Sequence, residues 1–221
     1  MMKRPEQRVV VLIDTQNMYH SAKYLFGSHL NFAKLVETVV ADRCLIRALA
    51  YVATSKNGDE KGFLGALVAN GIEIKSKDVI EFASGERKAD WDVGLAIDAV
   101  KFSDKVDVVI LVSGDGDFVP LVQYLQNKGV AVEVAAFGES TSKQLKDVVD
   151  DYFDISQHPT ELLMPTGRRT QPATFGGAQT ADTDMDLDFD IPEEDQMLLD
   201  EQDAKAGHKG PGRPRKIRVT T

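Results

Sequence analysis

The chain has 221 residues, 43% of them hydrophobic, and a formal net charge of −9, which suits one well-buried domain followed by a tail. The acidic balance argues against a broad electrostatic grip on nucleic acid, although a nucleic-acid enzyme can be acidic when the excess charge lies in a metal site and a tail. A single cysteine, Cys44, no signal-peptide core and no apolar run of membrane-spanning length predict a protein of the reducing cytoplasm without membrane contact.

Apolar runs alternate with amphipathic segments along the first two thirds of the chain, which predicts alternating strands and helices. The predicted strands cover residues 8–14, 45–53, 72–75, 79–82, 106–112, 130–137 and 153–155. The predicted helices cover residues 15–26, 32–43, 60–70, 90–102, 119–127 and 140–151. The strands at 72–75 and 79–82 are close enough to pair as a hairpin. The alternation as a whole predicts an α/β, Rossmann-like three-layer fold with a mainly parallel central sheet and right-handed crossovers.

The stretch VDVVILVSGDGDF, residues 106–118, combines a buried strand with a sharp acidic turn. Its apolar, β-branched start is typical of a central strand that is buried on both faces. Its two glycines let the backbone bend and approach a ligand closely. Asp115 and Asp117 therefore lie at the carboxyl end of a central strand, which is where open α/β sheets bind ligands.

Two further aspartates are expected at the same rim of the sheet. Asp14 ends the first strand, and Asp92 lies in the first turn of the helix over 90–102, so both can join Asp115 and Asp117 in one pocket. Carboxylates this close repel one another unless a cation lies between them. Oxygen ligands without cysteine or clustered histidine favour Mg²⁺ or Mn²⁺ over zinc. Such a site suits attack of a metal-activated water on a phosphodiester.

Helix capping is the simpler explanation for each of these aspartates taken singly. Asp14, Asp92 and Asp117 all stand where a predicted helix begins, and acidic residues are favoured there. Capping does not explain why four carboxylates converge on one rim. Asp98 lies nearly two turns after Asp92, and its position fits either a supporting role at the site or an ordinary polar helix residue.

Three motifs in the same order resemble those of the NYN domain family, and of its LabA-like branch in particular: VVVLIDTQN, KADWDVGLAIDAV and SGDGDFVPLV. The resemblance covers about residues 8 to 156. It implies a PIN-like fold and a ribonuclease site that depends on Mg²⁺ or Mn²⁺. By this resemblance the metal-holding catalytic residues are Asp14, Asp92, Asp115 and Asp117, supported by Asn17 and Ser113. Because the family includes members without demonstrated catalysis, the alternative is a non-catalytic regulator that binds RNA or protein.

RNA would need cations around the acidic pocket. Arg87 and Lys88 precede the helix that carries Asp92, and Lys143 and Lys146 lie in the last predicted helix. These four side chains are the candidate phosphate contacts, although lysine and arginine on a helix face are usually just solvated.

The domain is predicted to span residues 1–157, and residues 158–221 are predicted to form a disordered tail. After a linker rich in glycine and threonine, the stretch 182–203 holds eleven acidic residues and no basic one. Its acids are interleaved with apolar side chains, as in disordered segments that bind protein partners.

The last stretch, residues 204–221, is basic. Its sequence KGPGRPRK resembles the core of an AT-hook, in which Arg213 and Arg215 would enter the minor groove of DNA. The proline before Gly212 departs from the usual pattern, so a generic basic tail is the simpler interpretation.

Overall fold

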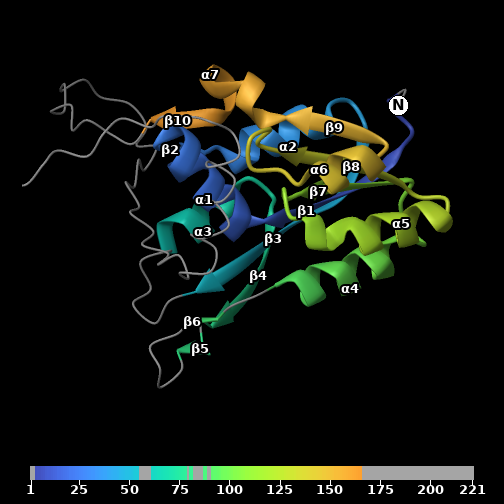
Figure 1. Ribbon diagram of the computed structural model, residues 1–221, viewed down its shortest axis with the longest axis horizontal. Helices are drawn as coiled ribbons and strands as arrows, with labels where there is room; N and C mark the ends of the chain where they lie inside the picture. The colour runs from blue at the N-terminus through green and yellow to red at the C-terminus, as the bar shows by residue number, and fades with distance from the viewer. Residues whose placement is uncertain (1–2, 55–60, 79, 82–86, 89–90, 166–221) are drawn as a thin grey trace, which may run out of the picture.

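The computed structural model describes residues 3–54, 61–78, 80–81, 87–88 and 91–165. In this part the chain forms a six-stranded sheet with helices on both faces (Figure 1). The strand order is β4-β3-β1-β7-β8-β9, and every neighbouring pair in the sheet is parallel. The predicted three-layer α/β fold with a mainly parallel sheet is therefore confirmed.

The sheet is built from β1 (Arg8–Asp14), β3 (Cys44–Thr54), β4 (Glu73–Asp78), β7 (Val108–Val112), β8 (Ala131–Ala136) and β9 (Asp151–Asp154). Two short antiparallel pairs lie outside it: β2 (Ser28–Leu30) with β10 (Leu163–Pro165), and β5 (Ile80–Glu81) with β6 (Arg87–Lys88). The helices are α1 (Thr15–Phe26), α2 (Phe32–Val40), α3 (Lys61–Ala69), α4 (Asp92–Phe102), α5 (Val119–Asn127), α6 (Lys143–Val148) and α7 (Pro159–Leu162), with short 3₁₀ turns η1 (Gly116–Phe118) and η2 (Ile155–Gln157).

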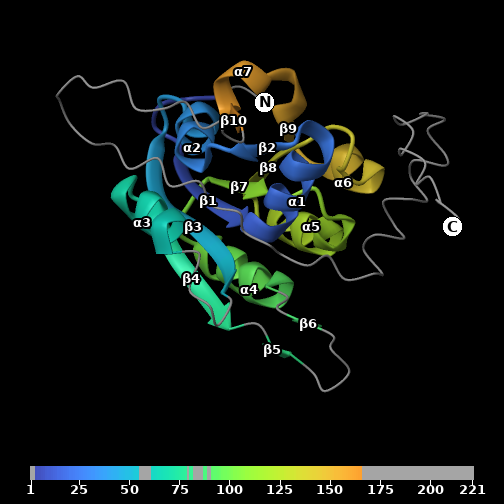
Figure 2. The ribbon, with the colours of Figure 1, turned by 90° about the vertical axis from the view of Figure 1, so that its left-hand side faces the viewer.

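The two central strands, β1 and β7, form the middle of the hydrophobic core. Residues 9–13 and 108–112 are all buried, as expected for parallel strands that are covered on both faces. Helices α4 and α5 lie side by side on one face of the sheet, and α1 and α2 lie on the other (Figures 1 and 2). This placement follows from right-handed crossovers, because the chain leaves β1 toward β3 and β4 and then returns to the opposite side of β1 to form β7.

Helix boundaries agree with the sequence where a local signal sets them. Asp14 caps α1 and accepts a hydrogen bond from the backbone N–H of Asn17, and Gly27 ends the helix with a φ of +57°. Helix α2 ends at Val40 rather than near residue 43, because Ala41 leaves the helical conformation.

The predicted hairpin between residues 72–75 and 79–82 is wrong. β4 runs parallel to β3 and extends the central sheet, with Lys75 opposite Tyr51. The antiparallel pairing occurs one element later, where β5 meets β6. The local sequence pattern indicates two strands close together along the chain. It does not indicate that the first of them, β4, pairs with β3.

Beyond Gln157, at which the sequence analysis places the domain boundary, the described chain adds α7 and β10. β10 pairs with β2, so this segment packs beside the short strand that follows α1. The predicted linker, acidic stretch and basic end, residues 166–221, lie outside the described residues. Within the described part, none of the helices is both long and apolar enough to cross a membrane.

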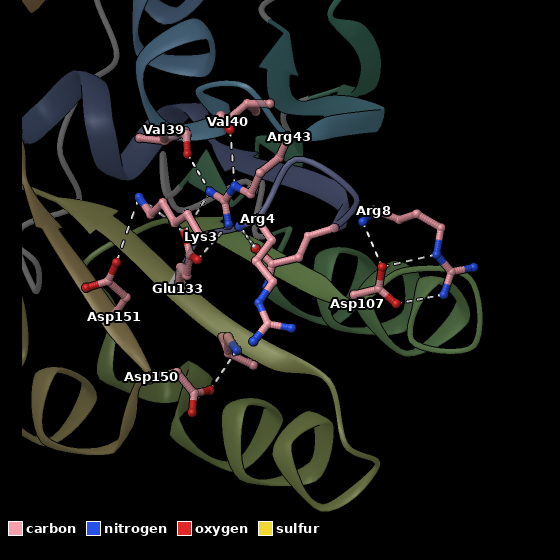
Figure 3. Close-up of polar contacts among 12 residues, drawn as sticks. Lys3, Arg4, Arg8, Val39, Val40, Arg43, Asp107, Glu133, Asp150 and Asp151 are labelled. Carbon is pink, nitrogen blue, oxygen red and sulfur yellow. Dashed lines mark hydrogen bonds and ion pairs between the residues drawn. The ribbon is translucent and has the colours of Figure 1, made fainter. Parts of the chain in front are cut away.

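A buried ion pair joins the end of α2 to β8 (Figure 3). The Arg43 guanidinium donates to both carboxylate oxygens of Glu133, at 2.7 and 3.0 Å, and also to the carbonyl oxygens of Val39 and Val40. The Arg43 side chain has no exposed surface. Arg43 therefore satisfies carbonyl groups at the end of α2 while it neutralises the buried carboxylate of Glu133 on β8.

Candidate metal site

The candidate site lies where the strand order of the sheet reverses. From β1 the chain builds outward to β3 and β4, whereas β7, β8 and β9 extend the sheet from the other side of β1 (Figure 2). The carboxyl ends of two adjacent parallel strands at such a reversal are the usual ligand-binding position of open α/β folds. Asp14 ends β1, and the acidic turn 113–117 follows β7.

Three carboxylates converge at this point. One oxygen each from Asp92, Asp115 and Asp117 lie within 4.8 Å of one another. Asp92 is the first residue of α4, whereas Asp115 accepts a hydrogen bond from the N–H of Asp117 at 2.9 Å and so caps η1. The convergence predicted from the sequence is present for these three, from two elements that are distant along the chain.

Asp14 lies next to this cluster but not within it. The Ser113 hydroxyl donates to Asp14 at 3.3 Å and accepts from the N–H of Asp115, also at 3.3 Å. The Asn17 side chain accepts from the N–H of Gly114 at 3.0 Å. Ser113 and Asn17 therefore connect the end of β1 to the acidic turn.

Burial raises the pKa of Asp14 from 3.8 to about 6. Hydrogen bonds from the backbone of Asn17 and from Ser113 oppose this shift, and the nearby charge of Asp115 adds to it. A buried carboxyl beside other carboxylates prefers its neutral form, and a cation placed among them would reverse that preference.

The raised pKa of Asp14 predicts that the contribution of Asp14 to the stability of the metal-free protein falls as the pH rises from about 4 to 6. Over this window the unfolded chain has already released the proton that the folded protein still holds. Raising the pH therefore favours the unfolded chain and lowers the free energy of unfolding. The Asp14→Asn variant lacks this titration, and its free energy of unfolding should fall less with pH. Urea unfolding in EDTA at a series of pH values measures both slopes, and parallel slopes would contradict the assignment.

The acidic turn is held from its other side by the segment before α6. The Ser142 N–H donates to the Gly114 carbonyl at 2.9 Å. A Cβ atom on Gly114 would lie 3.1 Å from the backbone of this segment, and one on Gly116 would lie 2.7 Å from the Ser142 hydroxyl oxygen. A side chain at Gly114 would therefore crowd the backbone of this segment, and one at Gly116 would force the Ser142 hydroxyl to move. The contact also explains why α6 begins at Lys143 rather than at residue 140, since Ser142 has a non-helical backbone with a ψ of 130°.

The donor set fits a hard divalent cation. All three groups in the cluster are carboxylates, which are the ligands that Mg²⁺ and Mn²⁺ prefer. Asp92 and Asp115 are partly buried and Asp117 is exposed, so an ion held there would remain open to water and substrate. Asp14, at the end of β1, adds a further carboxylate beside this cluster and is joined to it through the hydrogen bond from Ser113.

Asp98 lies in a different environment, on the buried side of α4. It accepts hydrogen bonds from the Tyr51 hydroxyl, at 2.9 Å, and from the Lys75 ammonium, and Lys101 lies 3.5 Å away. Burial opposes ionisation of Asp98, but these partners outweigh it and lower its pKa. The structure thus places Asp98 in a network between α4, β3 and β4 rather than in the carboxylate cluster.

The candidate RNA contacts differ in how they lie. Lys143 is exposed on α6, whereas the Lys146 ammonium donates to the Gly138 carbonyl and lies 5.4 Å from the centre of the Tyr152 ring. Arg87 and Lys88 form β6, and their side chains lie outside the described part. The possible DNA contacts in the tail lie outside it as well: Arg213 and Arg215.

The contact between Trp91 and Tyr51, which holds the start of α4 in place, was not predicted from the sequence. The Trp91 indole N–H donates to the Val52 carbonyl at 3.0 Å, and its ring packs edge-on against Tyr51, with centroids 5.4 Å apart. Trp91 directly precedes Asp92, so this anchor fixes where the first turn of α4 presents its carboxylate. The sequence signal for this anchor is a tryptophan directly before the motif aspartate. No local pattern identifies Tyr51, on β3, as the residue that it packs against.

Comparison with known proteins agrees with this fold. The family model of the NYN domain matches residues 8–156. The chain belongs to the NYN domain family. It is 29% identical over 161 residues to the Low amplitude and bright protein LabA of Synechococcus elongatus, which covers 67% of this chain and 84% of LabA and supports the LabA-like branch. A crystal structure of a protein of unknown function from Vibrio parahaemolyticus matches with a TM-score of 0.66 and 30% identity, over 74% of this chain and all of that one.

Proposed function

We propose that this NYN domain is a metal-dependent ribonuclease that hydrolyses RNA phosphodiester bonds. The observation that carries the proposal is the convergence of Asp92, Asp115 and Asp117 within 4.8 Å at the switch point of the sheet. Three carboxylates at that spacing repel one another unless a cation lies between them. Members of this family are typically nucleases, which favours the same conclusion.

In this proposal each side chain has a defined task. Asp92, Asp115 and Asp117 hold Mg²⁺ or Mn²⁺, and Asp14 completes the negative pocket from the end of β1. Ser113 and Asn17 fix the acidic turn against that strand end. When bound, the ion supplies a polarised water and positive charge for the phosphate. Lys143 is exposed and available to an RNA phosphate at the edge of the site.

A cleavage assay with a mixed panel of single-stranded and structured RNAs tests the proposal. We expect cleavage in Mn²⁺ or Mg²⁺ and at least a 100-fold loss in excess EDTA that is reversed by adding the ion back, because the carboxylates alone cannot neutralise the phosphate. Cleavage that persists in EDTA would contradict a role for the cluster. RNA binding in the presence of the ion without any cleavage would instead support the non-catalytic regulator.

A further inference from the structure

Three consecutive hydroxyl residues, Ser140, Thr141 and Ser142, lie against the acidic turn, and two of them are bonded within the protein. The Ser140 hydroxyl donates to the hydroxyl of Ser21 on α1 at 2.9 Å. The Thr141 hydroxyl donates to the Phe137 carbonyl at 2.6 Å. The Ser142 hydroxyl makes no hydrogen bond to any residue that the structure describes. Of the three, Ser142 is therefore the one whose hydroxyl can donate to a ligand.

Ser142 occupies the N-cap position of α6 without capping the helix. A serine at this position normally accepts a hydrogen bond from a backbone N–H of the first helical turn, which is why serine is favoured there. In α6 the Ser142 side chain makes no such bond. Helix capping therefore does not account for the hydroxyl at this position.

The Ser142 side chain lies against Gly116, in the middle of the acidic turn. A Cβ atom on Gly116 would lie 2.7 Å from the Ser142 hydroxyl oxygen and 3.1 Å from the Ser142 Cβ. Gly116 separates Asp115 from Asp117, and both of these carboxylates belong to the cluster. Ser142 is only partly buried, so its hydroxyl is both next to the candidate metal site and accessible from outside.

The backbone of Ser142 is held on both sides. Its N–H donates to the Gly114 carbonyl at 2.9 Å, and its carbonyl accepts from the N–H of Lys146 at 3.1 Å. The preceding residue, Thr141, is buried and is fastened to Phe137 through its side chain. The hydroxyl therefore projects from a fixed segment, which is the preorganisation that makes a hydrogen-bond donor effective in an active site.

A neutral donor suits this position better than a cation would. A lysine or arginine next to Asp115 and Asp117 would pair with their carboxylates and compete there with a metal ion. A hydroxyl adds no charge and leaves the carboxylates to the ion. It can still donate to the ionised phosphate of an RNA chain, and hydrogen bonds to an ionised acceptor are the stronger kind.

We propose that the Ser142 hydroxyl donates a hydrogen bond to a nonbridging oxygen of the scissile RNA phosphate. This inference rests on the proposed ribonuclease function and adds to it a catalytic residue outside the carboxylate cluster. During hydrolysis negative charge is spread over the nonbridging oxygens, and a donor fixed next to them stabilises that charge. The hydroxyl keeps its proton throughout, so the only bonds broken and formed are those of the hydrolysis itself.

Cleavage kinetics of wild type, Ser142→Ala and Ser140→Ala in Mn²⁺, with an RNA that the wild type cleaves, test this role. We expect kcat to fall about 100-fold in Ser142→Ala with little change in KM, because a donor of this kind acts mainly on the transition state. Ser140→Ala is the matched control, since it removes a hydroxyl that is bonded to Ser21 instead, and it should retain the wild-type rate. Equal losses in the two variants would overturn the proposal.

Failure of the ribonuclease function gives a different result from failure of this inference. If the wild type cleaves no RNA in Mn²⁺, both proposals are wrong. If the wild type cleaves and Ser142→Ala cleaves at the same rate, only the role of Ser142 is wrong.

Phosphorothioate RNA shows whether the contact is direct. Sulfur replaces one nonbridging oxygen of the scissile phosphate in each of two diastereomers, and sulfur is a weak hydrogen-bond acceptor. In Mn²⁺ we expect the wild type to cleave one diastereomer more slowly than the other and Ser142→Ala to lose this difference, because changes to the two partners of one contact are not additive. A difference of the same size in both proteins would contradict a direct hydrogen bond.

Calorimetric titration with Mn²⁺ in the absence of RNA separates Ser142 from the metal cluster. The dissociation constant should be the same in wild type and Ser142→Ala, because the hydroxyl is neutral and is not among the clustered oxygens. The melting temperature should also be unchanged, since no capping bond is lost. Weaker Mn²⁺ binding or a lower melting temperature would overturn the proposal, because the loss of cleavage would then come from the metal site or the fold.

Discussion

Replacing Asp115 with asparagine is expected to lower RNA cleavage at least 100-fold while the fold stays intact. Asparagine can accept the hydrogen bond from the N–H of Asp117 through its own side-chain oxygen, so the cap of η1 is kept. What is lost is one of three charges within 4.8 Å of one another, and with it much of the hold on a divalent cation. A loss of several kcal/mol of charge stabilisation corresponds to about 100-fold or more in rate.

The same substitution should leave the metal-free protein as stable as before, or more stable, because it removes a source of repulsion. Cleavage rates and melting temperatures in EDTA, measured on the same preparations, separate the two effects. Asp147→Asn makes the same change of charge at an exposed position on α6 and should retain full activity. Cleavage at the wild-type rate by Asp115→Asn would contradict the role of Asp115 in holding the metal. A lowered melting temperature would mean that the loss of cleavage comes from misfolding instead.

The sequence could predict those boundaries that have local chemistry of their own. α1 and α5 have the predicted bounds because each begins at a defined turn and is followed by a glycine with positive φ, namely Gly27 and Gly129. α6 is shorter than predicted, since residue 140 belongs to a turn and Ser142, whose N–H donates to the Gly114 carbonyl of the acidic turn, has a non-helical backbone. That contact joins segments that are distant along the chain, so no local pattern reports it.

In the candidate site, too, some positions follow from local sequence signals and others depend on contacts between distant segments. The sequence predicts that Asp92 meets Asp115 if the helix that Asp92 begins starts at the rim where the parallel strands end, and the structure brings the two carboxylates together. For Asp14 the sequence left open two explanations, helix capping and a place in the carboxylate pocket. One oxygen of Asp14 caps α1, and the other accepts a hydrogen bond from Ser113 beside the acidic turn. Asp98 could not be placed, since its environment is set by Tyr51 and Lys75, which come from other elements.

Glu133→Gln is expected to lower the free energy of unfolding by about 3 kcal/mol. The carboxylate of Glu133 neutralises a guanidinium whose side chain is completely buried, and glutamine leaves that charge without a counter-ion. The carbonyls of Val39 and Val40 still accept from Arg43 but carry no charge. Lys3, whose ammonium lies 3.8 Å from Glu133, cannot compensate because it has the same sign as Arg43.

The pair formed by Arg47 and Glu73 provides the matched control for urea unfolding of the two variants. It joins the same residue types through two hydrogen bonds, but both side chains are nearly half exposed, at 46% and 45%. Glu73→Gln should therefore cost less than about 1 kcal/mol, because water solvates the arginine that remains. Equal losses in Glu133→Gln and Glu73→Gln would show that water reaches Arg43 in solution, and the buried charge could then not be what fastens α2 to β8.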